Sequence, residues 1–211
     1  STGSQLTLAG APFNVPGVYS FPSGAYRMQG QAFPTAFGAG PTRLGAYRND
    51  VNYTNAQVGV EIATWDNSLN QAFGLLFRVK NLFLSGTEGY TMNYNNTSGD
   101  LQINLTVNEA PTTIGETTYS LDPASGPYRM VGEGYNSLMV VRVFRSSDPT
   151  TPIMAVIADE GTYADGKCGI FTYDNDPAEY PASGCDSTFD NYAATAAAHY
   201  PPIVTELLPR P

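Results

Sequence analysis

Residues 57–81 read QVGVEIATWDNSLNQAFGLLFRVKN, and their apolar side chains recur at every second position on both sides of a polar loop. The alternating residues are Val58, Val60 and Ile62 before the loop and Phe73, Leu75, Phe77 and Val79 after it. A period of two places successive side chains on opposite faces of an extended chain, which is typical of a strand with one buried face. The stretch therefore predicts two strands that contribute to one core.

The same period continues through most of the chain. Residues 101–107 alternate again, residues 137–145 are apolar on both faces and predict a central covered strand, and turn signals separate the runs. Further short runs lie at 18–21, 25–33, 89–95, 128–132, 153–159, 169–173 and 188–193. We expect an all-β fold, a two-sheet antiparallel β-sandwich of about a dozen strands, as one domain over 1–195.

The composition limits the partners of the protein. The 211 residues carry a formal net charge of -9 and only 14% charged residues. No basic stripe is present to neutralise phosphates, which argues against nucleic acid, and no window is apolar enough for membrane insertion. Two cysteines, 14 tyrosines and 21 glycines are typical of a secreted, extracellular or cell-surface chain.

Three stretches together resemble a known family. They are residues 60–81, GYTMNYN at 89–95, and the ending GKCGIFTYDN (166–175) with CDSTFDNYAA (185–194). Over residues 15–195 they resemble the concanavalin A-like jelly roll, and in particular LamG-like modules of secreted or surface bacterial proteins. The resemblance implies a structural calcium ion in many members and roles in glycan binding or adhesion, although some relatives hydrolyse glycans.

The sequence offers no complete set of catalytic residues. A glycosidase of this fold would carry paired carboxylates at alternate positions of one strand, so that both face one bond. Glu61 and Asp66 are five residues apart, which places them on opposite faces of a regular strand. The one histidine, His199, lies beside Tyr200 and Pro201 with no orienting partner for a triad.

Cys168 and Cys185 form the only available cysteine pair, and in a secreted chain we expect them to form a disulfide. The bridge would close a short loop and contribute about 3 kcal/mol in the chain-entropy model. A plain hairpin would not bring the two residues together, so the loop would have to fold back or the strands would not be hairpin partners. Buried free thiols are the alternative.

An acidic cluster near the chain's end is the candidate metal site. Calcium prefers six to eight oxygen ligands on a flexible loop. The candidate calcium ligands are Asp174, Asp176, Asp186 and Asp190, with Asn175 and Glu179 between them. No known calcium cassette is present, and capping of turns by these side chains is the alternative.

The loop after Trp65 is the candidate glycan site. Aromatic rings pack against sugar faces while amides and carboxylates bind hydroxyl groups. The candidates are Trp65, Asp66, Asn67, Asn70 and Gln71, with Tyr90 and Tyr94 on one face of a neighbouring strand. The alternative for each ring is a place in the core.

We interpret the chain as a non-catalytic module that binds a polysaccharide or glycoconjugate. An alternative is a structural subunit that self-associates through the extended, proline-rich tail at 196–211, with a helical turn over 193–198 leading into it. A polysaccharide-degrading enzyme is the third hypothesis, and the missing carboxylate pair weighs against it.

Overall fold

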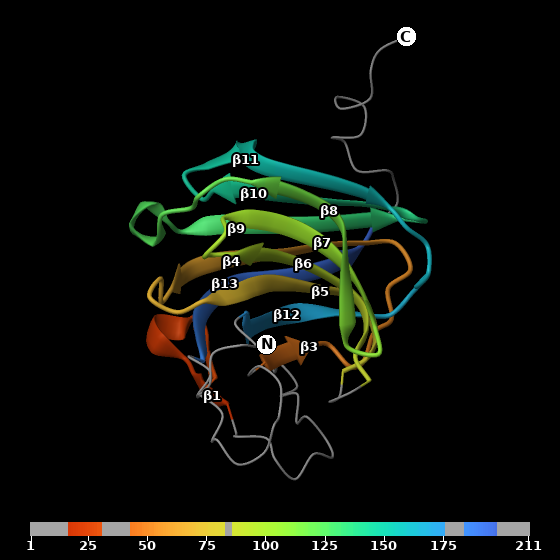
Figure 1. Cartoon of the computed structure of the whole chain (residues 1–211), viewed down its shortest axis with the longest axis horizontal. Helices are drawn as coiled ribbons and strands as arrows, with labels where there is room; N and C mark the ends of the chain where they lie inside the picture. Colours follow the sequence, from red (N-terminus) through yellow and green to blue (C-terminus); the bar gives the residue numbers. More distant parts are fainter. Residues whose placement is uncertain (1–16, 31–42, 83–85, 176–183, 198–211) are drawn as a thin grey trace.

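The computed structural model describes residues 17–30, 43–82, 86–175 and 184–197. These residues form 13 strands in two antiparallel sheets, which confirms the predicted β-sandwich (Figure 1). In spatial order the seven-stranded sheet is β1 (Val18–Ser20), β2 (Tyr26–Gly30), β13 (Cys185–Ala196), β4 (Ala56–Trp65), β9 (Tyr128–Tyr135), β10 (Leu138–Arg145) and β11 (Asp148–Asp159). The six-stranded sheet is β3 (Arg43–Tyr47), β12 (Lys167–Asp174), β5 (Gln71–Asn81), β6 (Glu88–Asn95), β7 (Asp100–Val107) and β8 (Ala110–Thr118). Two 3-10 turns, η1 (Pro22–Gly24) and η2 (Pro123–Ser125), precede β2 and β9.

The core lies between the two sheets, where the alternating residues of the opening stretch meet. Val58, Val60 and Ile62 of β4 are fully buried and share one hydrophobic cluster with Phe73 and Leu75 of β5. β4 belongs to the seven-stranded sheet and β5 to the six-stranded sheet. The loop between them therefore carries the chain from one layer to the other at an end of the sandwich.

The run at 137–145 becomes β10, which pairs with β9 on one side and β11 on the other. Met139, Val141 and Val143 lie in the core, and Val140 and Phe144 on the opposite face are also buried. The prediction of a strand covered on both faces is confirmed.

The alternation of β5 fails at one residue. Arg78 has a positive φ of 49° and interrupts the register with both neighbouring strands. Such a β-bulge re-aims the side chains that follow it. Val79 consequently leaves the core face and packs with Leu76 and Phe171 in a separate cluster, while Arg78 is fully buried.

Two other sequence expectations need correction. Ala193–Ala196 continues β13 as a strand, so the predicted helical turn is wrong over these residues. β3 and β8 were not predicted from the sequence; they form the two edges of the six-stranded sheet, where β8 exposes most of its side chains. The tail from 198, with His199, lies outside the described residues, so assembly through it stays a prediction.

The predicted disulfide is also wrong, because Cys168 and Cys185 are free buried thiols. The Gly184 amide, next to Cys185, donates a hydrogen bond to Asp174 at the end of β12. Cys168 lies six residues earlier in β12, about 20 Å away at the rise of a strand. A bridge requires Cα atoms within about 7 Å, so the crossover between sheets separates the pair.

No helix among the described residues is long and apolar enough to cross a membrane.

Candidate functional site

Three connections meet at one end of the sandwich. The Asp66 amide donates to the Asp186 carbonyl (3.1 Å), which joins the β4–β5 loop to β13. The Asn96 amide in the β6–β7 turn donates to the Gln71 carbonyl (3.1 Å). The Asn175 amide after β12 donates to the Asn70 carbonyl (2.9 Å). Backbone hydrogen bonds thus bring together two regions that the sequence places about a hundred residues apart.

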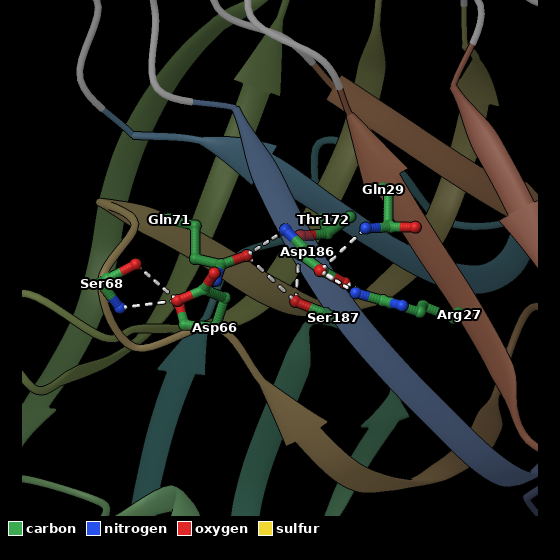
Figure 2. A network of polar contacts seen from close by, with 8 residues as sticks. All are labelled: Arg27, Gln29, Asp66, Ser68, Gln71, Thr172, Asp186 and Ser187. Atoms are coloured by element: carbon green, nitrogen blue, oxygen red, sulfur yellow. Dashed lines mark hydrogen bonds and ion pairs between the residues drawn. The ribbon is translucent and has the colours of Figure 1, made fainter. Parts of the chain in front are cut away.

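The convergence depends on a polar network, which we call the Asp186 network (Figure 2). Arg27 of β2 donates from Nε to Asp186 Oδ1 (2.8 Å), and its Nη2 forms an ion pair with Oδ2. Gln29 Nε2 donates to the same Oδ2 (3.0 Å). The members are Arg27, Gln29, Asp66, Ser68, Gln71, Thr172, Asp186 and Ser187. A planar guanidinium on a carboxylate gives the network a fixed geometry.

Gln71 is the fully buried centre that joins the network to the loop. Its Nε2 donates to the Asp66 carbonyl (2.6 Å), and its Oε1 accepts from the Asp186 amide (2.8 Å) and the Ser187 hydroxyl (3.2 Å). The Ser187 hydroxyl also lies 3.2 Å from that of Thr172 in the other sheet. Both ends of the amide are used inside the protein, so Gln71 is a positioning residue and not a ligand-binding one.

Above this network lies a patch of amides, hydroxyls and one carboxylate, which we call the Asn67 surface. Its members come from the β4–β5 loop and the β6–β7 turn: Asp66, Asn67, Ser68, Asn70, Asn96 and Thr97. Four of them are exposed and the two asparagines Asn70 and Asn96 are half-buried. The sequence predicted the β4–β5 loop members but not the two from the β6–β7 turn, whose proximity depends on sheet pairing.

Internal hydrogen bonds hold these groups in place. Ser68 donates from its hydroxyl (2.6 Å) and its amide (2.9 Å) to Asp66 Oδ1, and these bonds lower the pKa of the Asp66 carboxyl below its ordinary value. The Thr97 hydroxyl donates to Asn70 Oδ1 (2.9 Å), and Asn96 Nδ2 donates to the Leu69 carbonyl (2.8 Å). The patch is therefore an ordered array of hydrogen-bonding groups at the surface.

The aromatic candidates lie elsewhere. Trp65 is 5% exposed, Tyr94 is 1% exposed and Tyr90 is fully buried, and all three belong to the core cluster. The Trp65 ring packs against Phe73 at a centroid distance of 5.2 Å, and its Nε1 donates to Asn67 Oδ1 (3.0 Å). No face of these rings is open to a sugar, so the hypothesis that they stack on glycans is wrong. Trp65 instead supports the Asn67 surface from below.

The four predicted calcium ligands do not form one site. Asp186 and Asp190 are four residues apart on β13, about 13 Å along the strand, whereas ligand oxygens lie about 2.3–2.6 Å from calcium. Arg27 already holds Asp186, and Asp174 accepts from the Gly184 amide (3.0 Å). Asp176 lies outside the described residues, within which no cluster of three potential ligands is present. Calcium binding elsewhere stays a prediction.

The two carboxylates weighed as a catalytic pair are separated. Glu61 precedes Trp65 by four residues of β4, about 13 Å, which exceeds the 5–9.5 Å between glycosidase carboxylates. Directly opposite Glu61 lies Asp190 of β13, a pairing that the sequence did not reveal because it depends on register. Arg129 of β9 faces Glu61 from the other side, and Ser146 Oγ donates to Glu61 Oε2 (3.0 Å).

A second polar surface, unsuspected from the sequence, crosses the outer face of the six-stranded sheet. Asn104 Nδ2 donates to Asn93 Oδ1 (2.8 Å), and the Thr113 hydroxyl donates to Asn104 Oδ1 (2.8 Å). Asn93 and Asn104 are buried, so these amides mainly bind one another. The hydrogen-bonding groups of the Asn67 surface are more exposed than these two amides.

Comparison with known proteins shows the fold. No family model and no curated protein matches the chain. The carbohydrate-binding module CBM66 from Bacillus subtilis is 13% identical, with a TM-score of 0.62 over 86% of this chain and 93% of the module. The exoplasmic/lumenal domain of VIP36, in its Ca2+/Man2-bound form, is 8% identical, with a TM-score of 0.57 over 92% of this chain and 84% of that chain.

An enzyme contains the same fold. The GH43 protein BlXynB from Bacillus licheniformis is 11% identical, with a TM-score of 0.60 over 85% of this chain, which spans 34% of that protein. Identities this low show shared architecture alone. The chain has the concanavalin A-like jelly-roll fold that its sequence resembles.

Proposed function

We propose that the protein is a glycan-binding module whose binding site is the Asn67 surface. The observation that carries the proposal is the convergence of exposed amide, hydroxyl and carboxylate groups from two connections, held by a hydrogen-bonded network centred on the buried Gln71. Amides and carboxylates in fixed positions bind the paired hydroxyl groups of sugars. A carbohydrate-binding module and the VIP36 domain with its bound Man2 share the fold, which supports this class of ligand.

Charge favours a neutral glycan. The Asn67 surface contributes one carboxylate, Asp66, and no cationic side chain. Arg27, the nearest cation in the network, is paired with Asp186. A uronate or sulfate would approach the negative charge of Asp66 in a chain whose net charge is -9, and like charges repel.

Native affinity electrophoresis tests the proposal. Gels containing soluble mannan, xylan, mixed-linkage glucan, fructan, alginate or polygalacturonate are run with the wild type, Asn67→Ala and Asn52→Ala. Asn52 is an equally exposed asparagine beside Tyr53, which pairs with Gly166 at the opposite end of β12, and serves as the matched control.

We expect at least one neutral polysaccharide to retard the wild type and Asn52→Ala equally. Asn67→Ala should bind it about tenfold more weakly, because one hydrogen bond of about 1.4 kcal/mol corresponds to that factor. Equal retardation of all three proteins would place the site elsewhere. Retardation by the acidic polysaccharides alone would contradict the choice of neutral glycans.

Two further measurements separate the competing hypotheses. Repeating the gels with calcium and then with a chelator tests the predicted calcium ion, whose loss would weaken retardation in the chelator. Release of reducing ends from the retarding polysaccharide, abolished by Glu61→Gln, would instead support a hydrolase that uses the Glu61–Asp190 pair.

A further inference from the structure

The opposite end of the sandwich encloses a positive charge that forms no ion pair with any of the described residues. Arg78 is fully buried, and the bulge at its positive φ turns its side chain inward. Its Nη1 donates to the Asn136 carbonyl (2.7 Å) and lies 3.3 Å from the Tyr163 carbonyl. Its Nε and Nη2 are buried and form no hydrogen bond within the part of the chain that the structure describes. Buried donors without a partner are rare in native proteins, because each costs its full desolvation energy.

The nearby carboxylates are engaged by other donors. Glu160 accepts from the Tyr90 hydroxyl and from the Thr162 hydroxyl (2.6 Å). Asp165 forms an ion pair with Lys80. Burial lowers the pKa of Arg78, yet a guanidinium remains charged in proteins. Asp165 also interacts electrostatically with Arg78, but the hydrogen bonds of the guanidinium go to two neutral carbonyls, and the face of Phe77 packs on it with a centroid 5.2 Å from the guanidinium carbon.

The two unpartnered nitrogens of Arg78 are both donors. The Tyr192 hydroxyl is likewise buried and has no hydrogen-bond partner among the described residues. Arg78 and Tyr192 each interact electrostatically with the buried thiol of Cys168 on β12. Gly134 leaves room for the Phe77 ring and the guanidinium, because a Cβ atom there would lie 2.4 Å from Phe77 Cζ and 3.3 Å from Nη2. A water molecule must donate as well as accept, whereas an anion only accepts.

We propose that Nε and Nη2 of Arg78 bind a small monovalent anion of the halide class, enclosed at this end of the sandwich. The anion completes the hydrogen bonds of the guanidinium and supplies the missing counter-charge, so it stabilises the fold at a site remote from the Asn67 surface. Free phosphate or sulfate would bring more oxygens than these donors can satisfy.

Bromide provides the direct test. Crystals of the wild-type protein grown or soaked in sodium bromide should show an anomalous-scattering peak in contact with Nε and Nη2 of Arg78. Ordered water in that position, or no density at all, would overturn the proposal. This measurement needs no variant and decides the question even if substitution of Arg78 prevents folding.

Thermal unfolding provides the second test. At constant ionic strength, replacing gluconate by chloride should raise the unfolding temperature of the wild type and of Arg129→Met, a half-buried arginine on β9 that serves as the control. The chloride effect should vanish in Arg78→Met, since the methionine lacks the charge and the donors. An equal chloride effect in all three proteins would show a nonspecific salt response and contradict the site.

Discussion

Replacing Gln71 by leucine tests whether the Asp186 network supports this end of the sandwich. Leucine is close to glutamine in volume but neither donates nor accepts a hydrogen bond. Gln71 is fully buried, so the substitution leaves the Asp66 carbonyl and the Asp186 amide without their side-chain partner. The Ser187 hydroxyl is less affected, because Thr172 lies within hydrogen-bond distance of it.

Each orphaned group costs about 1–3 kcal/mol, so we expect Gln71→Leu to lower the free energy of unfolding by about 2–6 kcal/mol. In a domain of this size each kcal/mol lowers the unfolding temperature by about 2–4 °C, which predicts a fall of at least about 4 °C. Gln102→Leu on β7 is the control. Gln102 is half-buried and its amide makes longer contacts of 3.2 and 3.4 Å, so a loss below about 1 kcal/mol is expected.

Urea unfolding followed by tryptophan fluorescence measures both variants. Trp65 is the only tryptophan and lies beside the network, so its emission reports on this end of the fold. A Gln71→Leu protein as stable as Gln102→Leu would refute the reasoning, because it would show that the buried amide contributes nothing that an apolar side chain cannot replace.

Three other predictions follow from the fold and the site. Under non-reducing conditions a thiol reagent should modify neither cysteine of the native protein, because burial raises the pKa of Cys168 and Cys185 to about 12. The same reagent should modify both cysteines in denaturant. No reaction in denaturant would indicate a disulfide. Gly74→Ala should cost about 2–3 kcal/mol in urea unfolding, because the new Cβ would lie 2.2 Å from the Met92 carbonyl oxygen; wild-type stability would contradict this packing. The pKa of Asp66 in the folded protein is depressed, so its carboxylate stays charged above pH 4. Its contribution to glycan affinity is therefore lost only as the pH falls through that lowered pKa. A glycan affinity that changes between pH 8 and 5 would contradict this assignment.

The sequence predicted the architecture because hydrophobic alternation is a local signal. Val58, Val60 and Ile62 are buried as expected, and the two-sided apolar run became an interior strand. Which side chains of β5 face the core was predictable only as far as Phe77. The bulge at Arg78 depends on the register of two neighbouring strands, which no local pattern encodes.

The candidate site was predictable in part for the same reason. The polar loop after Trp65 was recognised from its residue types, but its neighbours Asn96 and Thr97 come from another hairpin. The surface role of Trp65 was misjudged, because an aromatic residue at a strand end has no sequence signal that separates the core from an open face. The predicted disulfide was wrong because β12 and β13 belong to different sheets, and the sequence does not show to which sheet each strand belongs.

A nuclear magnetic resonance titration tests the central claim most directly. Amide resonances of the 15N-labelled protein are followed while neutral manno-, xylo- and gluco-oligosaccharides are added in turn. Binding at the Asn67 surface predicts that one of them shifts the resonances of residues 66–70 and 96–97 together with the Trp65 indole, and leaves the Asn52 end unchanged. Shifts confined to another surface, or none with any of the sugars, would contradict the account.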